Sequence, residues 1–195
     1  MQIARPLTLA DVAAPRSNVL VNVALVIAAS LVTAGAAQLE LRLPWTPVPI
    51  TGQTFAVLLS GAVLGARRAF LAQALYLLEG AAGLPFFAGG AAGLAKLVGP
   101  TGGYLVAFPF AAALTGVLAE HAWDRKPLTM FLAMLGGSVI IFGLGLAQLS
   151  SFVPPATLLA NGLLPFIPGD ILKSAVAAGL FPIAWRFVSR LGGRA

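Results

Sequence analysis

Long stretches of this sequence carry no charged side chain, and this feature limits the possible folds more than any other. The first such run extends from Val19 to Gln38, and the other clearly polar residues in it are Asn22, Ser30 and Thr33. Charged residues make up 9% of the chain, whereas an average soluble domain has about 25%. So few charges cannot cover the surface of a water-soluble domain. We therefore expect an all-α membrane protein that forms one polytopic domain over residues 1–195.

The apolar runs predict six membrane-spanning helices. A spanning helix needs about 20 mostly apolar residues, at about 1.5 Å of rise each. The runs that meet or approach this length lie at about 19–38, 53–65, 69–87, 104–119, 128–148 and 169–187. A cleaved signal peptide is the competing interpretation of the first run, because Arg5 and Arg16 precede it. The length of the run, and the lack of a cleavage site before polar sequence, favour a helix.

The segment between the first two runs is apolar but cannot be a regular helix. It reads Leu-Pro-Trp-Thr-Pro-Val-Pro-Ile-Thr-Gly over residues 43–52, with prolines at 44, 47 and 49. Proline lacks the backbone N–H that a helix interior requires. Non-helical backbone at membrane depth is tolerated only where protein or a water-filled cavity surrounds it. We expect a loop after the first helix that folds back toward a pocket.

The basic residues predict the orientation of the chain. If the N-terminus is cytoplasmic, only two of the 12 basic residues, Arg42 and Lys96, fall in outer segments, and Lys173 falls in the last span. The inner segments then hold the other nine, namely Arg5, Arg16, Arg67, Arg68, Arg125, Lys126, Arg186, Arg190 and Arg194. An excess of Lys and Arg marks the cytoplasmic side. We therefore expect six helices with both termini in the cytoplasm.

Several classes of function are excluded by residues that the sequence lacks. There is no cysteine, so disulfides and cysteine-based zinc sites are excluded, and a single histidine, His121, cannot form an HExxH metal site. The net charge of +6 comes from scattered residues, whereas nucleic-acid binding needs them clustered on one face. The glycine-rich segment 99–104 lacks the Lys-Ser/Thr of a phosphate loop. We expect neither an enzyme nor a bound cofactor or metal.

Asp170 and Lys173 are the clearest candidates for a binding site. They lie three residues apart in the last span and so share one face of a helix. An ionisable side chain within a bilayer is costly and suggests function by default. An ion pair that only neutralises itself is the structural alternative. The pair follows Pro168-Gly169, and a helix that starts there directs free backbone N–H groups toward a ligand.

Three further features allow both a structural and a functional interpretation. Glu79, in the third span, is either a ligand contact or a residue at the outer interface. Lys96, in the outer glycine-rich loop, is either solvated or the partner of a carboxylate. Ala24 and Ala28 put two small residues on one face of the first helix. Such faces let helices approach closely in membranes, either within the protein or against a partner.

Four motifs in the expected order resemble the BioY family, the biotin-binding substrate-specific subunits of energy-coupling-factor (ECF) vitamin transporters. They are LPWTPVPITGQT at 43–54, GAAGLPFFAGG at 80–90, GPTGGY at 99–104 and PGDILK at 168–173. The resemblance runs from about Ala24 to Lys173. It implies biotin uptake across the bacterial cytoplasmic membrane. It also implies docking of Ala24 and Ala28 on a transmembrane coupling subunit, and ATP hydrolysis by partner ATPase subunits.

The resemblance also implies roles for individual residues. Asp170 would accept from the ureido N–H groups of biotin, and Lys173 would donate to the ureido oxygen. Lys96 and the N–H groups of the glycine loop would meet the tail carboxylate. The remaining candidates for the binding site are Trp45, Thr51, Gln53, Tyr76, Phe86, Gly102, Gly103 and Tyr104.

Two other classes of function stay open at this point. An autonomous transporter coupled to protons through Glu79 or Asp170 is one alternative, although no inverted repeat is visible. An intramembrane aspartyl hydrolase is the other, but such enzymes use a second aspartate, and Asp170 has no such partner in the membrane.

Overall fold

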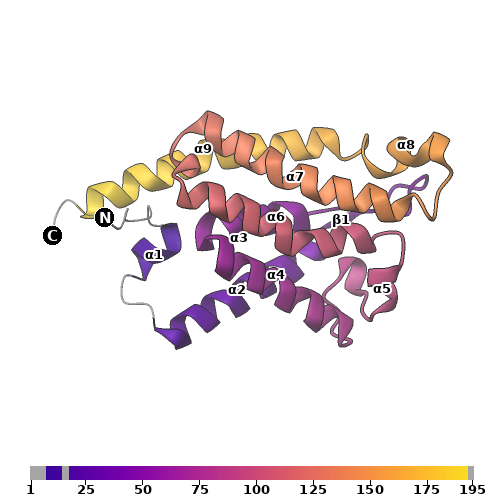
Figure 1. Cartoon of the computed structure of the whole chain (residues 1–195), viewed down its shortest axis with the longest axis horizontal. Coiled ribbons are helices and arrows are strands. Elements are labelled where there is room, and N and C mark those ends of the chain that lie inside the picture. The colour runs from indigo at the N-terminus through magenta and orange to yellow at the C-terminus, as the bar shows by residue number, and fades with distance from the viewer. Residues whose placement is uncertain (1–7, 15–17, 193–195) are drawn as a thin grey trace.

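The computed structural model describes residues 8–14 and 18–192, and within them the chain is mostly helical. Arg5, Arg16 and Arg194 lie outside the described residues, so their expected cytoplasmic placement is not addressed. Figure 1 shows the long helices arranged as an elongated bundle. They are α2 (Val19–Ala37), α3 (Gln53–Leu64), α4 (Ala66–Ala81), α6 (Gly102–Glu120), α7 (Pro127–Leu149) and α9 (Ile167–Gly192). The shorter elements are α1 (Leu9–Ala13), β1 (Glu40–Leu41), β2 (Ile50–Thr51), η1 (Ala88–Gly90), α5 (Ala95–Val98), η2 (Trp123–Arg125), η3 (Pro155–Thr157) and α8 (Leu158–Gly162).

Four of these helical segments are long and apolar enough to cross a membrane. They are α2, α6, α7 and residues 155–188, which contain most of α9. The helix α3 is apolar but has only 12 residues, and the 16 residues of α4 include Arg67, Arg68 and Glu79. The six predicted spans therefore overlap six helices, but length and composition alone support four crossings.

The centre of the bundle is α6, which packs against α3, α4 and α7. Small residues at the crossings allow this close approach. A side-chain carbon added at Gly116 would lie 2.4 Å from the backbone nitrogen of Ala66, and one at Gly61 would lie 2.4 Å from the carbonyl oxygen of Ala112. These two glycines thus serve helix packing.

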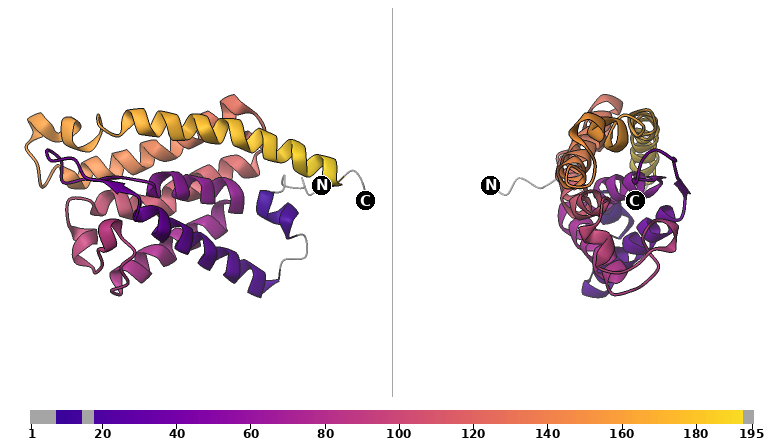
Figure 2. Two further views of the ribbon diagram at one scale, coloured as in Figure 1. Left: turned by 180° about the vertical axis from the view of Figure 1, so that it is seen from behind. Right: turned by 90° about the vertical axis from the view of Figure 1, so that its right-hand side faces the viewer.

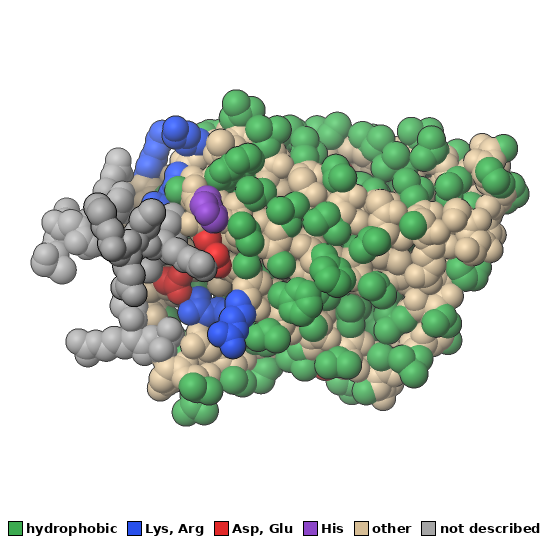
Figure 3. Space-filling model, in the orientation of Figure 1, with side chains coloured by type: hydrophobic (Ala, Val, Ile, Leu, Met, Phe, Trp, Pro, Cys, Tyr) green, Lys and Arg blue, Asp and Glu red, His purple; other side chains and the backbone are tan. Residues whose placement is uncertain are grey.

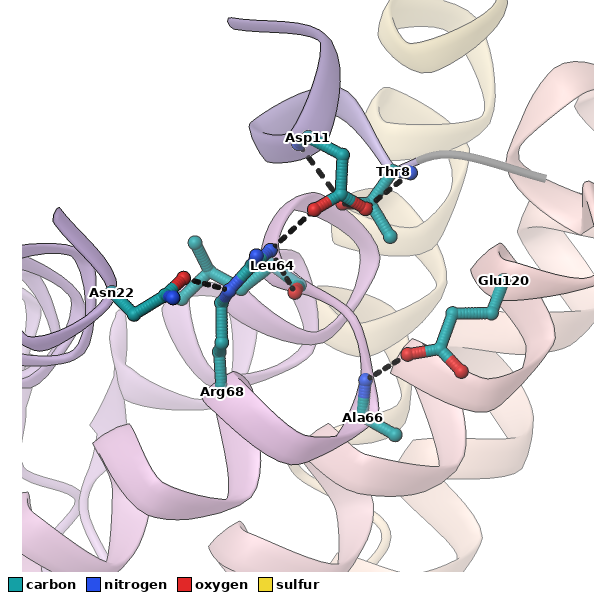
Figure 4. Close-up of polar contacts among 7 residues, drawn as sticks. All are labelled: Thr8, Asp11, Asn22, Leu64, Ala66, Arg68 and Glu120. Atoms are coloured by element: carbon teal, nitrogen blue, oxygen red, sulfur yellow. Dashed lines mark hydrogen bonds and ion pairs between the residues drawn. The ribbon is translucent and has the colours of Figure 1, made fainter. Parts of the chain in front are cut away.

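The third span, α4, begins at Ala66, before the expected start at residue 69, and so includes Arg67 and Arg68. Both arginines lie in the first turn of α4, because Gly65 takes a φ of +81° and ends α3. The carboxylate of Glu120 accepts a hydrogen bond from the Ala66 nitrogen at 2.9 Å (Figure 4). An acidic group at a helix N-terminus satisfies a free N–H and complements the helix dipole. The third span also ends earlier than expected, at Ala81, before Gly83 with its φ of +109°.

Arg68 joins three helices at the same end of the bundle. Its guanidinium donates to Asp11 of α1 at 2.7 Å and to Asn22 of α2 at 2.8 Å (Figure 4). Burial acts to raise the pKa of Asp11, but the hydrogen bonds from Arg68 and Thr8 outweigh it and hold that pKa below its usual value. This junction fixes where α2 begins relative to α4.

A second polar cluster ties the turn between α6 and α7 to α9. Asp124 is buried and accepts a hydrogen bond from the indole nitrogen of Trp185 at 2.5 Å. The guanidinium of Arg125 lies 3.5 Å from the centre of the same indole ring. Burial raises the pKa of Asp124, and the bond from Trp185 and the charge of Arg125 offset this only in part.

Charged and apolar side chains are segregated along the molecule. On the face shown in Figure 3, charged side chains gather at the end that carries α1 and the last turns of α9, and hydrophobic side chains are spread over the remainder. This distribution is that of a protein whose apolar band contacts lipid. Both described chain ends lie at this charged end (Figures 1 and 2).

The proline-rich segment forms the opposite end of the molecule together with α8. Its two ends pair as antiparallel strands, with Glu40 opposite Thr51 and Leu41 opposite Ile50. The Thr46 hydroxyl donates to the carbonyl of Asn161 at 2.6 Å, which joins the loop to the end of α8. Figure 2 shows the segment after α2 reaching the end that carries α8.

Candidate functional site

A cavity of about 330 Å³ lies between the proline-rich segment and the helices α3, α6, α7 and α9. Its size falls at the lower end of the range for small-molecule sites, about 300–1,000 Å³. Residues 43, 46–51, 53 and 54 line it, so the proline-rich loop does fold back against a pocket. The floor and walls bring together residues from positions 40 to 173 of the sequence.

Asp170 stands in the wall of the cavity near the start of α9. Its side chain is largely buried, and one carboxylate oxygen accepts a hydrogen bond from the Ser138 hydroxyl of α7 at 2.8 Å. The other carboxylate oxygen takes part in none of the hydrogen bonds of the described residues. Asp170 therefore keeps acceptor capacity for a ligand.

Lys173 lies one turn further along the same face of α9 and also lines the cavity. Its ammonium donates to the backbone carbonyl of Thr51 at 2.8 Å and to the Thr54 hydroxyl at 3.0 Å. An ammonium has three N–H donors, so one is left for a ligand. Asp170 and Lys173 form no ion pair with each other, although both belong to the described part of the chain.

Three more charged residues, Glu40, Arg42 and Lys96, line the cavity on the side of the proline-rich and glycine-rich loops. Arg42 pairs with Glu40 at 2.8 Å. Lys96 forms no ion pair within the residues that the structure describes. The cavity lining holds three basic and two acidic side chains, so it has one excess positive charge. Such a cavity suits a ligand with one negative charge.

The remaining walls are largely apolar. Tyr104, Leu105 and Phe108 come from α6, and Phe142 and Phe166 approach from α7 and the segment before α9. The rings of Tyr104 and Phe142 meet edge to face, with centroids 6.5 Å apart. The Tyr104 hydroxyl donates its proton to the carbonyl of Gly162 at 2.8 Å, so it has no proton left to donate to a ligand.

Of the sequence-predicted site residues, six line the cavity, namely Thr51, Gln53, Lys96, Tyr104, Asp170 and Lys173. Tyr76 does not: it is fully buried behind Gln53, accepts from that amide, and donates to the carbonyl of Phe86 at 3.1 Å. The hydrogen bond between Tyr76 and Gln53 therefore orients the Gln53 side chain. Phe86 contributes this carbonyl without lining the cavity, and Trp45 is 61% exposed at the loop surface.

Gly102 and Gly103 also lie outside the cavity lining, for a packing reason. A side-chain carbon at Gly102 would come within 1.8 Å of the Leu97 carbonyl oxygen, and one at Gly103 within 2.2 Å of the Leu144 carbonyl oxygen. The Gly102 N–H already donates to the carbonyl of Gly99 at 3.0 Å. These glycines let the start of α6 pack against α7 and the α5 turn.

Sequence reasoning missed several lining residues. Thr54 belongs to the first motif but has no sequence signal of its own. Phe108, Phe142 and Phe166 come from three distant segments, and only the tertiary fold brings them together. Arg42 and Glu40 flank the proline-rich segment, and this local polarity is a signal that would have found them.

Glu79 and the small-residue pair Ala24 and Ala28, which the sequence also singled out, lie away from the cavity. Glu79 accepts a hydrogen bond from the Ser30 hydroxyl of α2 at 2.5 Å and does not line the cavity. Ala24 and Ala28 are exposed on α2, so they do not pack inside the bundle. Gly35 lies on the same face of α2. A side-chain carbon added at Gly35 would have no neighbouring atom within 4 Å.

The sequence and the fold are similar to those of known proteins. The sequence profile of the BioY family matches residues 9–190. The chain is 40% identical to the biotin transporter BioY of Rhizobium etli over 146 residues, covering 71% of this chain and 78% of the relative. It is 41% identical to the biotin transporter BioY of Thermotoga maritima over 140 residues, covering 71% and 81%.

A solved structure shares the fold. It is the crystal structure of the S-component for biotin from an ECF-type ABC transporter, at a TM-score of 0.72 and 24% identity. The match covers 85% of this chain and 90% of that chain. At this identity the likeness concerns the fold alone.

Proposed function

Because the chain belongs to the BioY family, we propose that it binds biotin and serves biotin uptake as the substrate-specific subunit of an ECF-type transporter. The observation that carries the proposal is the pair Asp170 and Lys173, which face the cavity and are held by separate partners. A pair present only for mutual neutralisation would be in contact.

The free hydrogen-bonding groups of this pair match the ureido ring of biotin. That ring offers two N–H donors and one carbonyl acceptor. Asp170 has an oxygen available to accept, and Lys173 has one N–H available to donate. Hydrogen bonds to charged groups are stronger than neutral ones, at about 1.5–3 kcal/mol each, and they would orient the ring at the α9 wall.

The rest of the ligand fits the remaining lining. The thioether ring and the aliphatic tail suit Phe108, Phe142 and Phe166, and the excess positive charge suits the tail carboxylate. Lys96, which lacks an ion-pair partner within the described residues, is the better of the loop cations for that carboxylate. Mostly apolar walls with a few convergent polar groups are typical of such sites.

We place this subunit in the cytoplasmic membrane as six helices, with both termini inside. The basic side chains of Arg67, Arg125 and Lys126 support this orientation, because they belong to segments at the end that carries α1. The short α3 and α4 are proposed to complete the bundle alongside the four longer helices.

Transport would depend on partner subunits. The sequence has no phosphate-binding loop, so ATP is proposed to be hydrolysed by ATPase subunits, with a transmembrane coupling subunit between. The exposed small face of α2 around Ala24 and Ala28 supports docking on that subunit, since small residues permit close helix approach.

Thermal unfolding of the detergent-purified protein tests the ligand. A ligand that binds only the folded state raises the melting temperature by mass action. Biotin is expected to raise it, whereas riboflavin and thiamine are expected to leave it unchanged. No shift with millimolar biotin refutes the proposal. Uptake in vesicles that needs a proton gradient but no ATPase subunits would favour an autonomous transporter instead.

A further inference from the structure

We propose that Ser138 is a positioning residue for the ligand, because its hydroxyl holds the carboxylate of Asp170 away from Lys173 and keeps both charged groups facing the cavity. The inference rests on the proposed function, since it concerns how the same site is prepared for biotin. Ser138 is 3% exposed and does not line the cavity, so it acts through Asp170.

The spacing on α9 makes a direct ion pair the simplest arrangement for these two residues. Side chains three residues apart on a helix are neighbours, and opposite charges attract strongly where water is excluded. Nevertheless, Asp170 and Lys173 form no ion pair within the described residues. Something must oppose their attraction.

Two separate anchors oppose it. The hydroxyl of Ser138 on α7 binds one oxygen of Asp170 at 2.8 Å. The carbonyl of Thr51 and the hydroxyl of Thr54, at the junction of β2 and α3, bind the ammonium of Lys173 at 2.8 and 3.0 Å. The anchors belong to different elements, so the packing of α7 and α3 against α9 sets the separation of the charges. Without the anchor on α7, Asp170 is free to turn toward Lys173 and to satisfy it in place of the ligand.

The chain offers a matched control in Ser174. It lies one turn after Asp170 on the same helix and is 1% exposed, and its hydroxyl has no hydrogen-bond partner within the described residues. Ser174→Ala therefore removes the same buried atom as Ser138→Ala, without removing a bond to Asp170.

The experiment compares biotin affinity in these variants, each purified in detergent as the full chain. Because a hydrogen bond to a charged group is stronger than one between neutral groups, Ser138→Ala is expected to weaken biotin binding about tenfold. Ser174→Ala is expected to stay within about twofold of the unaltered protein. Thr54→Val keeps the shape of Thr54 but removes the hydroxyl that binds Lys173, and a loss of affinity is expected there as well.

An infrared measurement separates positioning from a general structural effect. The carboxylate stretching band that disappears in Asp170→Asn is expected to shift in Ser138→Ala and to stay in place in Ser174→Ala. Unchanged affinity or an unchanged band in Ser138→Ala would overturn the inference, as would equal losses in the two serine variants. If Ser138→Ala does not fold, Ser138→Cys replaces the hydroxyl by a weak donor, and unchanged affinity in that variant overturns the inference. If the unaltered protein does not bind biotin, the proposed function fails, and the band of the ligand-free protein still tests Ser138.

Discussion

Replacing Asp170 by asparagine keeps the shape of the side chain but removes its negative charge. The amide oxygen can still accept from Ser138, which donates to Asp170 at 2.8 Å. The substitution removes the negative charge and the second carboxylate oxygen, which is the one available to accept from a ligand. A hydrogen bond to a charged group contributes about 1.5–3 kcal/mol, so biotin affinity should fall by a factor of roughly 10 to 150. Folding should change little, because the amide oxygen keeps the bond from Ser138 and Lys173 keeps its bonds to Thr51 and Thr54.

Lys173→Met should act differently on the ligand-free protein. It leaves the carbonyl of Thr51 and the hydroxyl of Thr54 without the ammonium that both now bind. A buried polar group left unsatisfied costs about 1–3 kcal/mol. This variant should therefore lose both biotin affinity and thermal stability, and it should melt below Asp170→Asn.

The double variant decides between a binding site and a self-neutralising pair. If the two residues only neutralise each other, loss of one charge is harmful and loss of both relieves the harm, so the double variant would recover biotin affinity. We expect calorimetric titration to show that the double variant still binds biotin poorly. Glu79→Gln is the matched control, because it makes the same kind of change in an acid outside the cavity, and it should bind biotin within about twofold of the unaltered protein. Recovered affinity in the double variant would refute the assignment.

Three further predictions concern regions outside the cavity. Ala28→Trp should weaken co-purification with the coupling subunit and spare biotin binding, since a large ring prevents close helix approach; loss of biotin binding with intact assembly would contradict the docking face. A cysteine in place of Arg67 should be labelled by a membrane-impermeant reagent from the cytoplasm and one in place of Lys96 from outside; labelling of Lys96→Cys only from the cytoplasm would contradict the topology. Asp124→Asn should raise the melting temperature at neutral pH. Burial raises the pKa of the Asp124 carboxyl above its unfolded value of 3.8. Ionisation of this carboxyl therefore costs stability as the pH rises from the unfolded pKa through the raised, folded pKa. The asparagine amide carries no such cost, and its oxygen can still accept from Trp185. An unchanged or lower melting temperature would show that the carboxylate is compensated in the folded state.

The sequence alone was sufficient to predict a helical membrane protein and the family to which it belongs. Runs such as Val19 to Gln38 indicate a membrane environment directly, because a helix that crosses the bilayer needs about 20 mostly apolar residues. The proline-rich loop was equally predictable, since its prolines exclude a regular helix wherever the segment lies. Asp170 and Lys173 were identifiable because charge within an apolar run is costly.

The bounds of the third span needed the structure. The apolar run predicted a start at residue 69, after Arg67 and Arg68, yet both arginines lie inside the first turn of α4. The φ of Gly65 and the distant carboxylate of Glu120 set that boundary. Glu120 is 54 residues from Ala66 along the chain, so no local pattern reports the contact.

The tertiary structure also decided which residues form the cavity wall and how the charged pair is used. Gly102 and Tyr76 belong to or lie near recognisable motifs, but the first packs against backbone and the second lies behind Gln53. Ser138 carries no sequence signal, and its role depends on α7 lying against α9. A sequence specifies which groups are costly to bury, because that cost belongs to each residue by itself. Which partners relieve the cost depends on helices that meet only after folding, so only the structure shows that Asp170 and Lys173 are anchored apart.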